Sequence, residues 1–259
     1  MNFSELSTGL TEEIKKCPGQ MSIMLEVDNH TFEWESDRKI TSASLIKLPI
    51  LLEGFKQIEL GKWNLSEAIQ ILESQKVEGA GVIQALSTAE LSVHDLLTLM
   101  IIVSDNTATN ILIDLFDMEQ INAFIKDSGC VSTELNRKMM DFKAIEKGIN
   151  NWTTSREMML MLQEIDNGSR FSSKSRDYMK GILHNQQLLD KLPLFIDTEK
   201  GWIGNKTGEL PGIEHDCAIM KVGGRTAYIS VLCDDLPSKG KGKIAIANIG
   251  ELVWKYMLN

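Results

Sequence analysis

A serine and a lysine three positions apart, Ser44 and Lys47, form the first pattern in the chain that could do chemistry. Residues three apart on a helix share a face, so the hydroxyl and the amine can lie within hydrogen-bond reach. A serine hydroxyl needs an adjacent base to attack, and a lysine can be that base when burial or nearby cations lower its pKa. We therefore predict that Ser44 is a nucleophile and that Lys47 activates it. The alternative is that Ser44 only caps a helix.

Two further motifs follow, Ser104-Asp105-Asn106 and Lys206-Thr207-Gly208. Ser104 lies 60 residues after Ser44, and Lys206 lies 102 residues after Ser104. Each motif alone is weak, and another S-x-x-K match in the chain, Ser238 to Lys241, is read as a decoy. The order and spacing of all three motifs make the combination specific. Lys206 would also supply the cation that lowers the pKa of Lys47.

The three motifs, taken in this order, resemble those of class A β-lactamases and penicillin-binding proteins. Residues 91–110 resemble the helix and loop that carry the second motif in that family, and Thr153-Thr154 resembles the exit from its omega loop. The resemblance spans nearly the whole chain. It implies a serine hydrolase that forms an acyl-enzyme with amide, β-lactam or ester substrates, with weak or slow β-lactamase activity.

The resemblance also implies a role for each polar residue of the motifs. Ser104 would relay a proton to the leaving nitrogen, and Asn106 would hold Lys47 and the amide side chain of the substrate. Lys206 and Thr207 would meet the substrate carboxylate on an edge strand.

Backbone groups complete the site that the resemblance implies. Gly208 would let the substrate backbone lie close, because glycine has no side chain. The backbone N–H groups of Ser44 and Glu209 would form the oxyanion hole. The substrate is thus expected to be a small molecule or peptide that bears a carboxylate.

The sequence departs from the class A pattern in the omega loop, where the family carries a glutamate that activates water for deacylation. Glu134-Leu135-Asn136 resembles that segment, but it lies too close to Ser104. The better register aligns residues 133–137 with the segment before the glutamate and puts Met139 at the base position. Asp141 is the nearest carboxylate and the candidate for activating water. The reading of Asp141 as a solvated loop acid is nevertheless favoured over the catalytic one.

A second departure is His215, which stands where many relatives carry a basic residue facing the substrate carboxylate. A neutral histidine binds an anion poorly, and its ordinary pKa is about 6.5. We keep two readings open, a substrate-binding His215 whose anion affinity weakens as the pH rises and a structural His215. The neighbouring Asp216 would point to the opposite face of a strand.

Hydrophobic periodicity predicts the elements that must position these groups. It predicts helices over residues 3–17, 44–55, 92–103, 106–116, 118–128, 155–165 and 243–257, and strands over residues 21–27, 31–34, 201–206, 217–222 and 226–233. The helix at 92–103 has a capping signal, with Ser92 followed by Asp95. The predicted fold class is α+β, with an antiparallel sheet flanked by terminal helices and an inserted all-helical part, as in the β-lactamase and transpeptidase fold.

This order of elements predicts two lobes. Residues 1–42 and 192–259 would form a discontinuous lobe built on the sheet, and residues 43–191 would form the helical lobe. The active site is expected in the cleft between them.

Composition excludes several other classes. The 259 residues are 43% hydrophobic and 24% charged, as in ordinary globular proteins. The formal net charge of −9 and the lack of a basic stripe disfavour a nucleic-acid partner. The longest apolar runs are too short to span a bilayer. The four histidines form no zinc-binding pair, and we expect neither a metal nor another cofactor.

The four cysteines, Cys17, Cys130, Cys217 and Cys233, match no zinc or redox motif. We expect buried free thiols, with a Cys217–Cys233 disulfide as the less favoured alternative. Free thiols and the lack of a signal segment at residues 1–16 predict a cytoplasmic monomer, or a secreted protein if a signal segment has been trimmed from this sequence.

The second hypothesis for function is a penicillin-binding or peptide-sensing protein that has kept the cleft without efficient turnover. The missing glutamate favours this hypothesis, and the intact Ser44, Lys47, Ser104 and Lys206 disfavour it.

Overall fold

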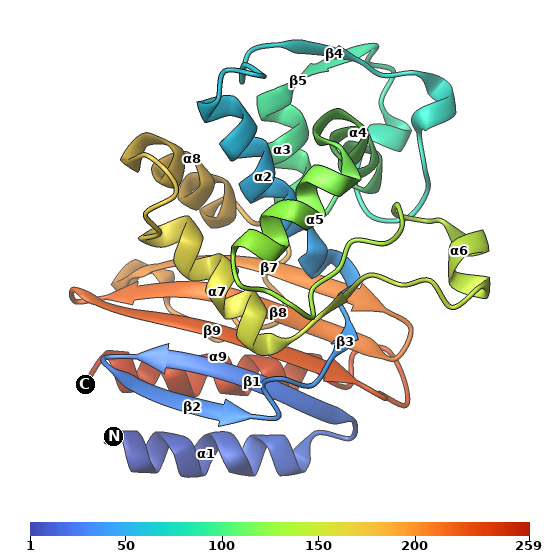
Figure 1. The fold of residues 1–259 in the computed structure, drawn as a ribbon. Helices are drawn as coiled ribbons and strands as arrows, with labels where there is room; N and C mark the ends of the chain where they lie inside the picture. Colours follow the sequence, from blue (N-terminus) through green and yellow to red (C-terminus); the bar gives the residue numbers. More distant parts are fainter.

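The computed structural model describes residues 1–259 and shows a five-stranded antiparallel sheet with helices on both faces (Figure 1). The strand order is β2-β1-β9-β8-β7, so strands from the two ends of the chain form one sheet. The segments between β2 and β7 are mostly helical and stack on one face of that sheet. The α+β class predicted from the sequence is confirmed.

The sheet strands are β1 (Gln20–Val27), β2 (His30–Trp34), β7 (Trp202–Leu210), β8 (Ile213–Val222) and β9 (Arg225–Asp234). The helices are α1 (Phe3–Lys16), α2 (Lys47–Glu59), α3 (Val93–Ile102), α4 (Asn106–Phe116), α5 (Met118–Asp127), α6 (Phe142–Glu146), α7 (Ser155–Asp166), α8 (Ser173–His184) and α9 (Lys243–Met257). Two short strand pairs, β3 (Ile40–Thr41) with β6 (Trp152–Thr153) and β4 (Ala68–Gln70) with β5 (Glu90–Ser92), were not predicted, nor were α6 and α8. No helix is both long enough and apolar enough to cross a membrane.

Local sequence explains the start of the sheet. Asn2 caps α1 through its side chain, and α1 buries Leu6 and Leu10. Asp28 and Asn29 both have positive φ, which is the geometry of a tight two-residue hairpin between β1 and β2. The helices α1 and α9 lie side by side under the sheet, and the two chain ends lie near each other (Figure 1).

Two hydrophobic clusters flank the sheet. The smaller one joins α1 and α9 to residues of β1, β8 and β9. The larger cluster contains residues of α2, α3, α4, α5, α7 and α8, and it includes sheet residues such as Ile219 and Leu232. The helical part therefore packs directly on the sheet, and the lobe boundaries at residues 42 and 192 stay a prediction.

A clamp around Asp105 fixes the turn between α3 and α4. One carboxylate oxygen of Asp105 accepts the N–H groups of Val82 (2.6 Å) and Ile83 (2.9 Å), and the other accepts the N–H of Ala108 at the start of α4 (2.9 Å). Gly81 has a φ of 110°, and a Cβ there would lie 2.3 Å from the Asp105 carboxylate. Only glycine fits at this position, and the clamp holds residues on both sides of Asp105.

The four cysteines are buried free thiols, as predicted. The alternative Cys217–Cys233 disulfide is wrong, because the strand register places Cys217 opposite Ser230 and Cys233 opposite Glu214. The thiol of Cys217 instead contacts the carbonyl oxygen of Lys206 at 3.6 Å.

We predict that Gly81→Ala lowers the free energy of unfolding by about 3 kcal/mol or more, because the new methyl group would meet the Asp105 carboxylate at a strained φ. The matched control is Gly61→Ala. Gly61 also has positive φ (72°), but nothing lies within 4 Å of its added Cβ, so the expected loss is only about 1 kcal/mol. Urea unfolding of both variants measures the difference, and equal losses would show that the clamp does not constrain this loop.

Candidate active site

Ser44 stands at the start of a buried helix. It lies in a short 3-10 helix, Ala43–Ile46, that runs directly into α2. Ala43 has a φ of 46°, a conformation that alanine rarely adopts and that is often found at functional sites. Pro49 falls in the first turn of α2, where its missing N–H is tolerated. The half-buried Ser44 lines a cleft of about 240 Å³.

Two buried lysines, Lys47 and Lys206, donate hydrogen bonds to one serine, Ser104. The amine of Lys47 donates to the carbonyl oxygen of Ser104 (2.6 Å), to its Oγ (3.0 Å) and to Asn106 Oδ1 (3.1 Å). The amine of Lys206 donates to the same Ser104 Oγ at 3.0 Å. Ser104 has a φ of 56°, in the left-handed region. The structure thus brings Lys47, Ser104, Asn106 and Lys206 together.

The expected hydrogen bond between Ser44 and Lys47 does not form in this structure. The three N–H groups of Lys47 are taken by Ser104 and Asn106. The positive φ of Ser104, which the sequence does not reveal, accompanies this arrangement. Ser44 and Asn106 nevertheless line the same cleft, so the nucleophile and the polar cluster meet there.

Neither buried lysine has a carboxylate partner. Burial lowers the pKa of Lys47 well below its ordinary value, and the charge of Lys206 lowers it further. Burial also lowers the pKa of Lys206 to about 7, although nearby acidic groups such as Asp216 oppose the shift. Both shifts favour loss of a proton, and a lysine amine that has lost one carries a lone pair that can accept a proton from a hydroxyl.

The edge strand β7 brings Gly208 against Ser44. A Cβ on Gly208 would lie 3.2 Å from the Cβ of Ala43 and 3.3 Å from the backbone nitrogen of Ser44. Glu209 follows Gly208 and lines the cleft, while Thr207 is buried beside it. Burial would raise the pKa of Glu209, but hydrogen bonds from Lys191 and Lys243 outweigh it and hold the pKa at about 2. The absence of a side chain at position 208 keeps the space beside Ser44 N–H open.

His215 has a structural position, which corrects its expected role as a substrate ligand. The ring is fully buried, Nδ1 accepts the N–H of Cys233 at 3.0 Å, and Nε2 lies 3.0 Å from the carbonyl oxygen of Thr41. Because Nδ1 accepts an N–H, it carries no proton itself. The ring proton is therefore on Nε2, which donates to Thr41. Burial lowers the pKa of His215 to about 4. The neutral ring therefore links β9 to β3 and presents no charge to the cleft.

Asn110 attaches the segment that contains Met139, the omega segment, to α4. Its side chain accepts the N–H of Met139 (2.7 Å) and donates to the Met139 carbonyl oxygen (3.1 Å). Met139 and Met140 line the cleft together with Ser44. Asp141 is exposed and caps α6 by accepting the N–H of Ala144 (3.0 Å). It does not line the cleft, so its expected role in activating water does not fit this structure.

Sequence reasoning missed several residues of the cleft wall. Arg137 is buried, has no carboxylate partner, and its Nε has no hydrogen-bond partner. Asn151 fixes the same segment, because its Oδ1 accepts the N–H groups of Asn136 (2.8 Å) and Arg137 (3.0 Å). Gly79 and Ala80 complete the wall from the clamped loop. The one sequence signal for this wall concerned Asn110, which holds Met139. Asn110 lies four residues after Asn106 and thus on the same helix face.

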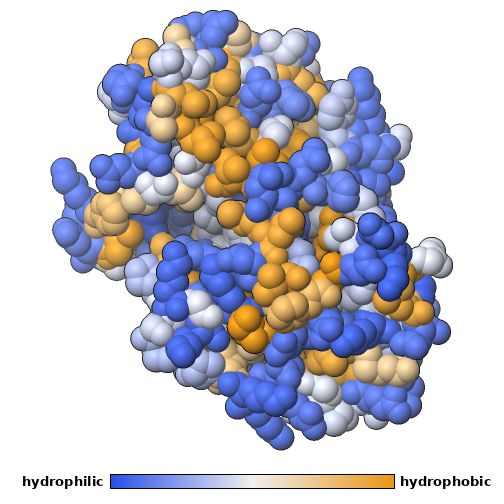
Figure 2. Space-filling view, turned by 180° about the vertical axis from the view of Figure 1, so that it is seen from behind, coloured by the Kyte–Doolittle hydropathy of each residue, from blue (hydrophilic) through white to orange (hydrophobic).

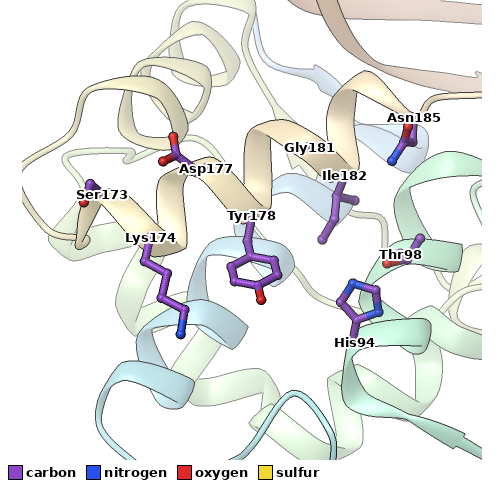
Figure 3. Close-up of a pocket in the computed structure, with 9 residues that line it drawn as sticks. All are labelled: His94, Thr98, Ser173, Lys174, Asp177, Tyr178, Gly181, Ile182 and Asn185. Carbon is purple, nitrogen blue, oxygen red and sulfur yellow. The ribbon is translucent and has the colours of Figure 1, made fainter.

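The surface and the cavities place this cleft apart from the other hollows. In the view from behind, the surface is hollowed between the helical part and the sheet (Figure 2). A larger cavity of about 610 Å³ lies between α3 and α8, lined by His94, Thr98 and Tyr178 among others (Figure 3). Ser44, Lys47, Ser104 and Lys206 do not line that cavity, and we do not assign the reaction to it.

The chain matches a family model over nearly all of its length. The model is described as "Beta-lactamase enzyme family", and it matches residues 5–257. The solved structure of a β-lactamase from Sphaerobacter thermophilus DSM 20745 is similar, with a TM-score of 0.91 and 27% sequence identity. That match covers 99% of this chain and 98% of the other.

Two more distant structures share the fold. PBP-A has a TM-score of 0.88 and 22% identity, and the match covers 97% of this chain and 95% of PBP-A. An ancestral class A β-lactamase of Gram-negative bacteria has a TM-score of 0.88 and 22% identity, covering 96% of this chain and 99% of the other. A variant of PBP-A is described as an acyl-enzyme complex with penicillin G.

We predict that His215 makes stability fall as the solution becomes acidic. Its folded pKa of about 4 lies below the ordinary 6.5, so the unfolded chain binds the proton more tightly. The stabilisation is full above about pH 6.5 and is lost as the pH falls towards 4, by at most about 3 kcal/mol. His215→Gln should flatten the pH dependence of the unfolding free energy over this range.

The matched control is His94→Gln, which changes a histidine with a side chain 44% exposed and should keep the wild-type slope. If His215→Gln kept the same slope, the loss of stability in acid would have another origin.

Proposed function

Because this chain belongs to the β-lactamase enzyme family, we propose that it works through an acyl-enzyme on Ser44. The chain is a serine hydrolase of the class A type in family and fold. The observation that carries the mechanism is the contact of Lys47 and Lys206 with Ser104, beside the cleft that Ser44 lines.

In the proposed acylation, Lys47 acts as the base. Its lowered pKa favours the neutral form, and that form would take the Ser44 proton, either directly after a small side-chain movement or through Ser104. Ser104 Oγ accepts from two amines, so its own O–H can point towards the leaving nitrogen. The backbone N–H groups of Ser44 and Glu209 would receive the developing oxyanion beside Gly208.

We propose that the substrate combines a carboxylate with a β-lactam, amide or ester carbonyl. Two cationic groups support this proposal: Lys206 beside Ser104, and Arg137 in the cleft wall without a carboxylate partner. A small molecule or a peptide end would fit a cleft of about 240 Å³. Glu209 lies in the same wall but is neutralised by Lys191 and Lys243, so it opposes an anion less than a free carboxylate would.

Deacylation is proposed to be slow with β-lactams. The omega segment contributes Met139 and Met140 to the cleft and no carboxylate. A thioether cannot take a proton from water, and a positioned general base contributes typically about 10²–10⁴-fold. The opened β-lactam stays attached to the acyl group, whereas the leaving group of an ester or peptide diffuses away. Native substrates could then be turned over with Lys47 as the base.

The alternative function, a penicillin-binding or peptide-sensing protein, rests on the same two methionines. A cleft that acylates and does not deacylate is a receptor in practice. The PBP-A variant with bound penicillin G is a relative in which an acyl-enzyme could be observed. Repeated turnover of an ester would separate the enzyme from the receptor.

We further propose a cytoplasmic monomer that binds no nucleic acid. The support is four cysteines that all remain unbridged, as suits a reducing compartment, and an acidic chain with a net charge of −9.

We predict a stoichiometric burst of penicillin consumption followed by little turnover, because acylation has its groups and deacylation lacks a base. Intact-protein mass during incubation should show one penicillin adduct per chain, and Ser44→Ala should show none. The same samples should turn over a carboxylate-bearing ester repeatedly. Rapid hydrolysis of penicillin with no adduct would contradict slow deacylation, and labelling of Ser44→Ala would contradict the nucleophile.

We predict that Met139→Glu accelerates release of the penicillin adduct by at least about 10-fold, because it puts a general base at the wall of the cleft. Met139→Gln is the matched control, because glutamine has the same shape and polarity as glutamate but cannot accept a proton from water. The decay of the adduct mass over time measures both rates. Equal decay in the two variants would show that position 139 does not face the acyl carbon.

A further inference from the structure

Two thiols that lie far apart in the sequence meet beneath the sheet. The sulfur atoms of Cys17 and Cys233 are 3.3 Å apart, although the residues are 216 positions apart in the chain. Both residues belong to the smaller hydrophobic cluster, between the sheet and the terminal helices. The other two thiols, of Cys130 and Cys217, contact backbone carbonyl oxygens instead. The chain therefore holds a single close pair of thiols.

Regular backbone structure holds this pair in place. Cys17 ends α1, and its N–H donates to the carbonyl oxygens of Glu13 and Ile14. The chain then turns through Pro18 and Gly19 into β1, whose Met21 pairs with Cys233 on β9. The main chains approach closely here, since a Cβ on Gly19 would lie 2.3 Å from the carbonyl oxygen of Asp234.

A disulfide needs only a small movement from this starting point. The S–S bond length is about 2.05 Å, so the sulfurs must approach by roughly 1.3 Å. The bond would close a loop of more than two hundred residues, and long loops lose the most entropy in the unfolded chain when they are cross-linked.

The two thiols are not equivalent, which sets the order of the chemistry. Cys17 is 9% exposed, whereas Cys233 is fully buried. A hydrogen bond from the Cys233 thiol lowers the pKa of Cys17 to about 7, against the effects of burial and of the Glu214 carboxylate, and the Gly19 N–H assists. The same pairing and burial raise the pKa of Cys233. Cys17 is thus the sulfur that ionises and the one that a reagent reaches first.

We propose that Cys17 and Cys233 are a built-in site for a reversible disulfide that ties α1 to β9. In the first step the Cys17 thiolate attacks a small-molecule disulfide RSSR, which forms a Cys17–SR bond and releases one RS⁻. Cys233 then loses its proton and attacks the Cys17 sulfur, which forms the Cys17–Cys233 bond and releases a second RS⁻. The two protons of the thiols leave with the two RS⁻ groups as RSH. The protein is oxidised by two electrons, and RSSR is reduced.

The site is independent of the proposed reaction, because neither cysteine lines the cleft. It is nevertheless close to the scaffold of the cleft. The N–H of Cys233 donates to His215, which in turn contacts the carbonyl oxygen of Thr41, three residues before Ser44. The disulfide would therefore fasten the strand that supports this part of the site.

The test treats the full-length protein with 2-hydroxyethyl disulfide, unfolds it, and alkylates free thiols with N-ethylmaleimide. The expected mass shows two maleimides per chain after oxidation and four after reduction with dithiothreitol. A peptide map should join the peptides of Cys17 and Cys233. The melting temperature should rise by roughly 5–10 °C on oxidation and return on reduction.

Two variants separate this site from general thiol oxidation. Cys17→Ser should abolish both the loss of maleimide-reactive thiols on oxidation and the change in melting temperature. The matched control Cys130→Ser should keep both effects. The wild-type peptide map stands even if Cys17→Ser does not fold. Four maleimides after oxidation, a bond to Cys130 or Cys217, a cross-link between chains, or a lower melting temperature would each overturn the proposal.

Discussion

The site depends on two buried lysine amines that share one hydroxyl and form no ion pair with a carboxylate. Lys47 and Lys206 are both fully buried, and both donate to Ser104 Oγ. Burial makes both charged forms costly, and the charge of Lys206 adds to the cost at Lys47, so the pKa values of both lysines are lowered. An unpaired buried charge is normally eliminated from a protein interior, because its desolvation is not compensated. The presence of two such lysines here indicates that the surrounding structure maintains their low proton affinity.

Three parts of the chain that are distant in sequence must hold that contact. Asp105 clamps the loop around Ser104 to residues 82 and 83, and the apolar α2 presents Lys47 from below. The edge strand β7 brings Lys206 from the last third of the chain. Asn110, on the same helix as Asn106, fixes the omega segment by two hydrogen bonds to Met139. The helix that supports the lysine contact therefore also positions the methionines that line the cleft beside Ser44.

Much of this arrangement could be read from the sequence because it depends on local signals. The capping box of Ser92 and Asp95, the short apolar strands and the order of the three motifs all carry their own physical cause. The errors arose where a distant segment decides. The strand pattern could not reveal that Thr41 lies across from His215, so the sequence left the ligand and structural readings of this histidine open. The amine of Lys47 bonds to Ser104, whose φ is positive, and not to Ser44, and no residue type in the sequence indicates that conformation. Asp141 was assigned by proximity in sequence, but it caps a helix that the periodicity did not predict.

The sheet joins the first strands of the chain to the last, and this has a consequence during synthesis. Met21 on β1 pairs with Cys233 on β9, so β1 has no partner on that side until almost the whole chain has been made. Pairings of such long range form slowly, and an unpaired strand edge is prone to association with other chains. Lys47 and Ser104 leave the ribosome long before Lys206. The nascent chain therefore carries Ser44, the proposed nucleophile, without the complete set of groups proposed to activate it, and these groups come together only with the final strands.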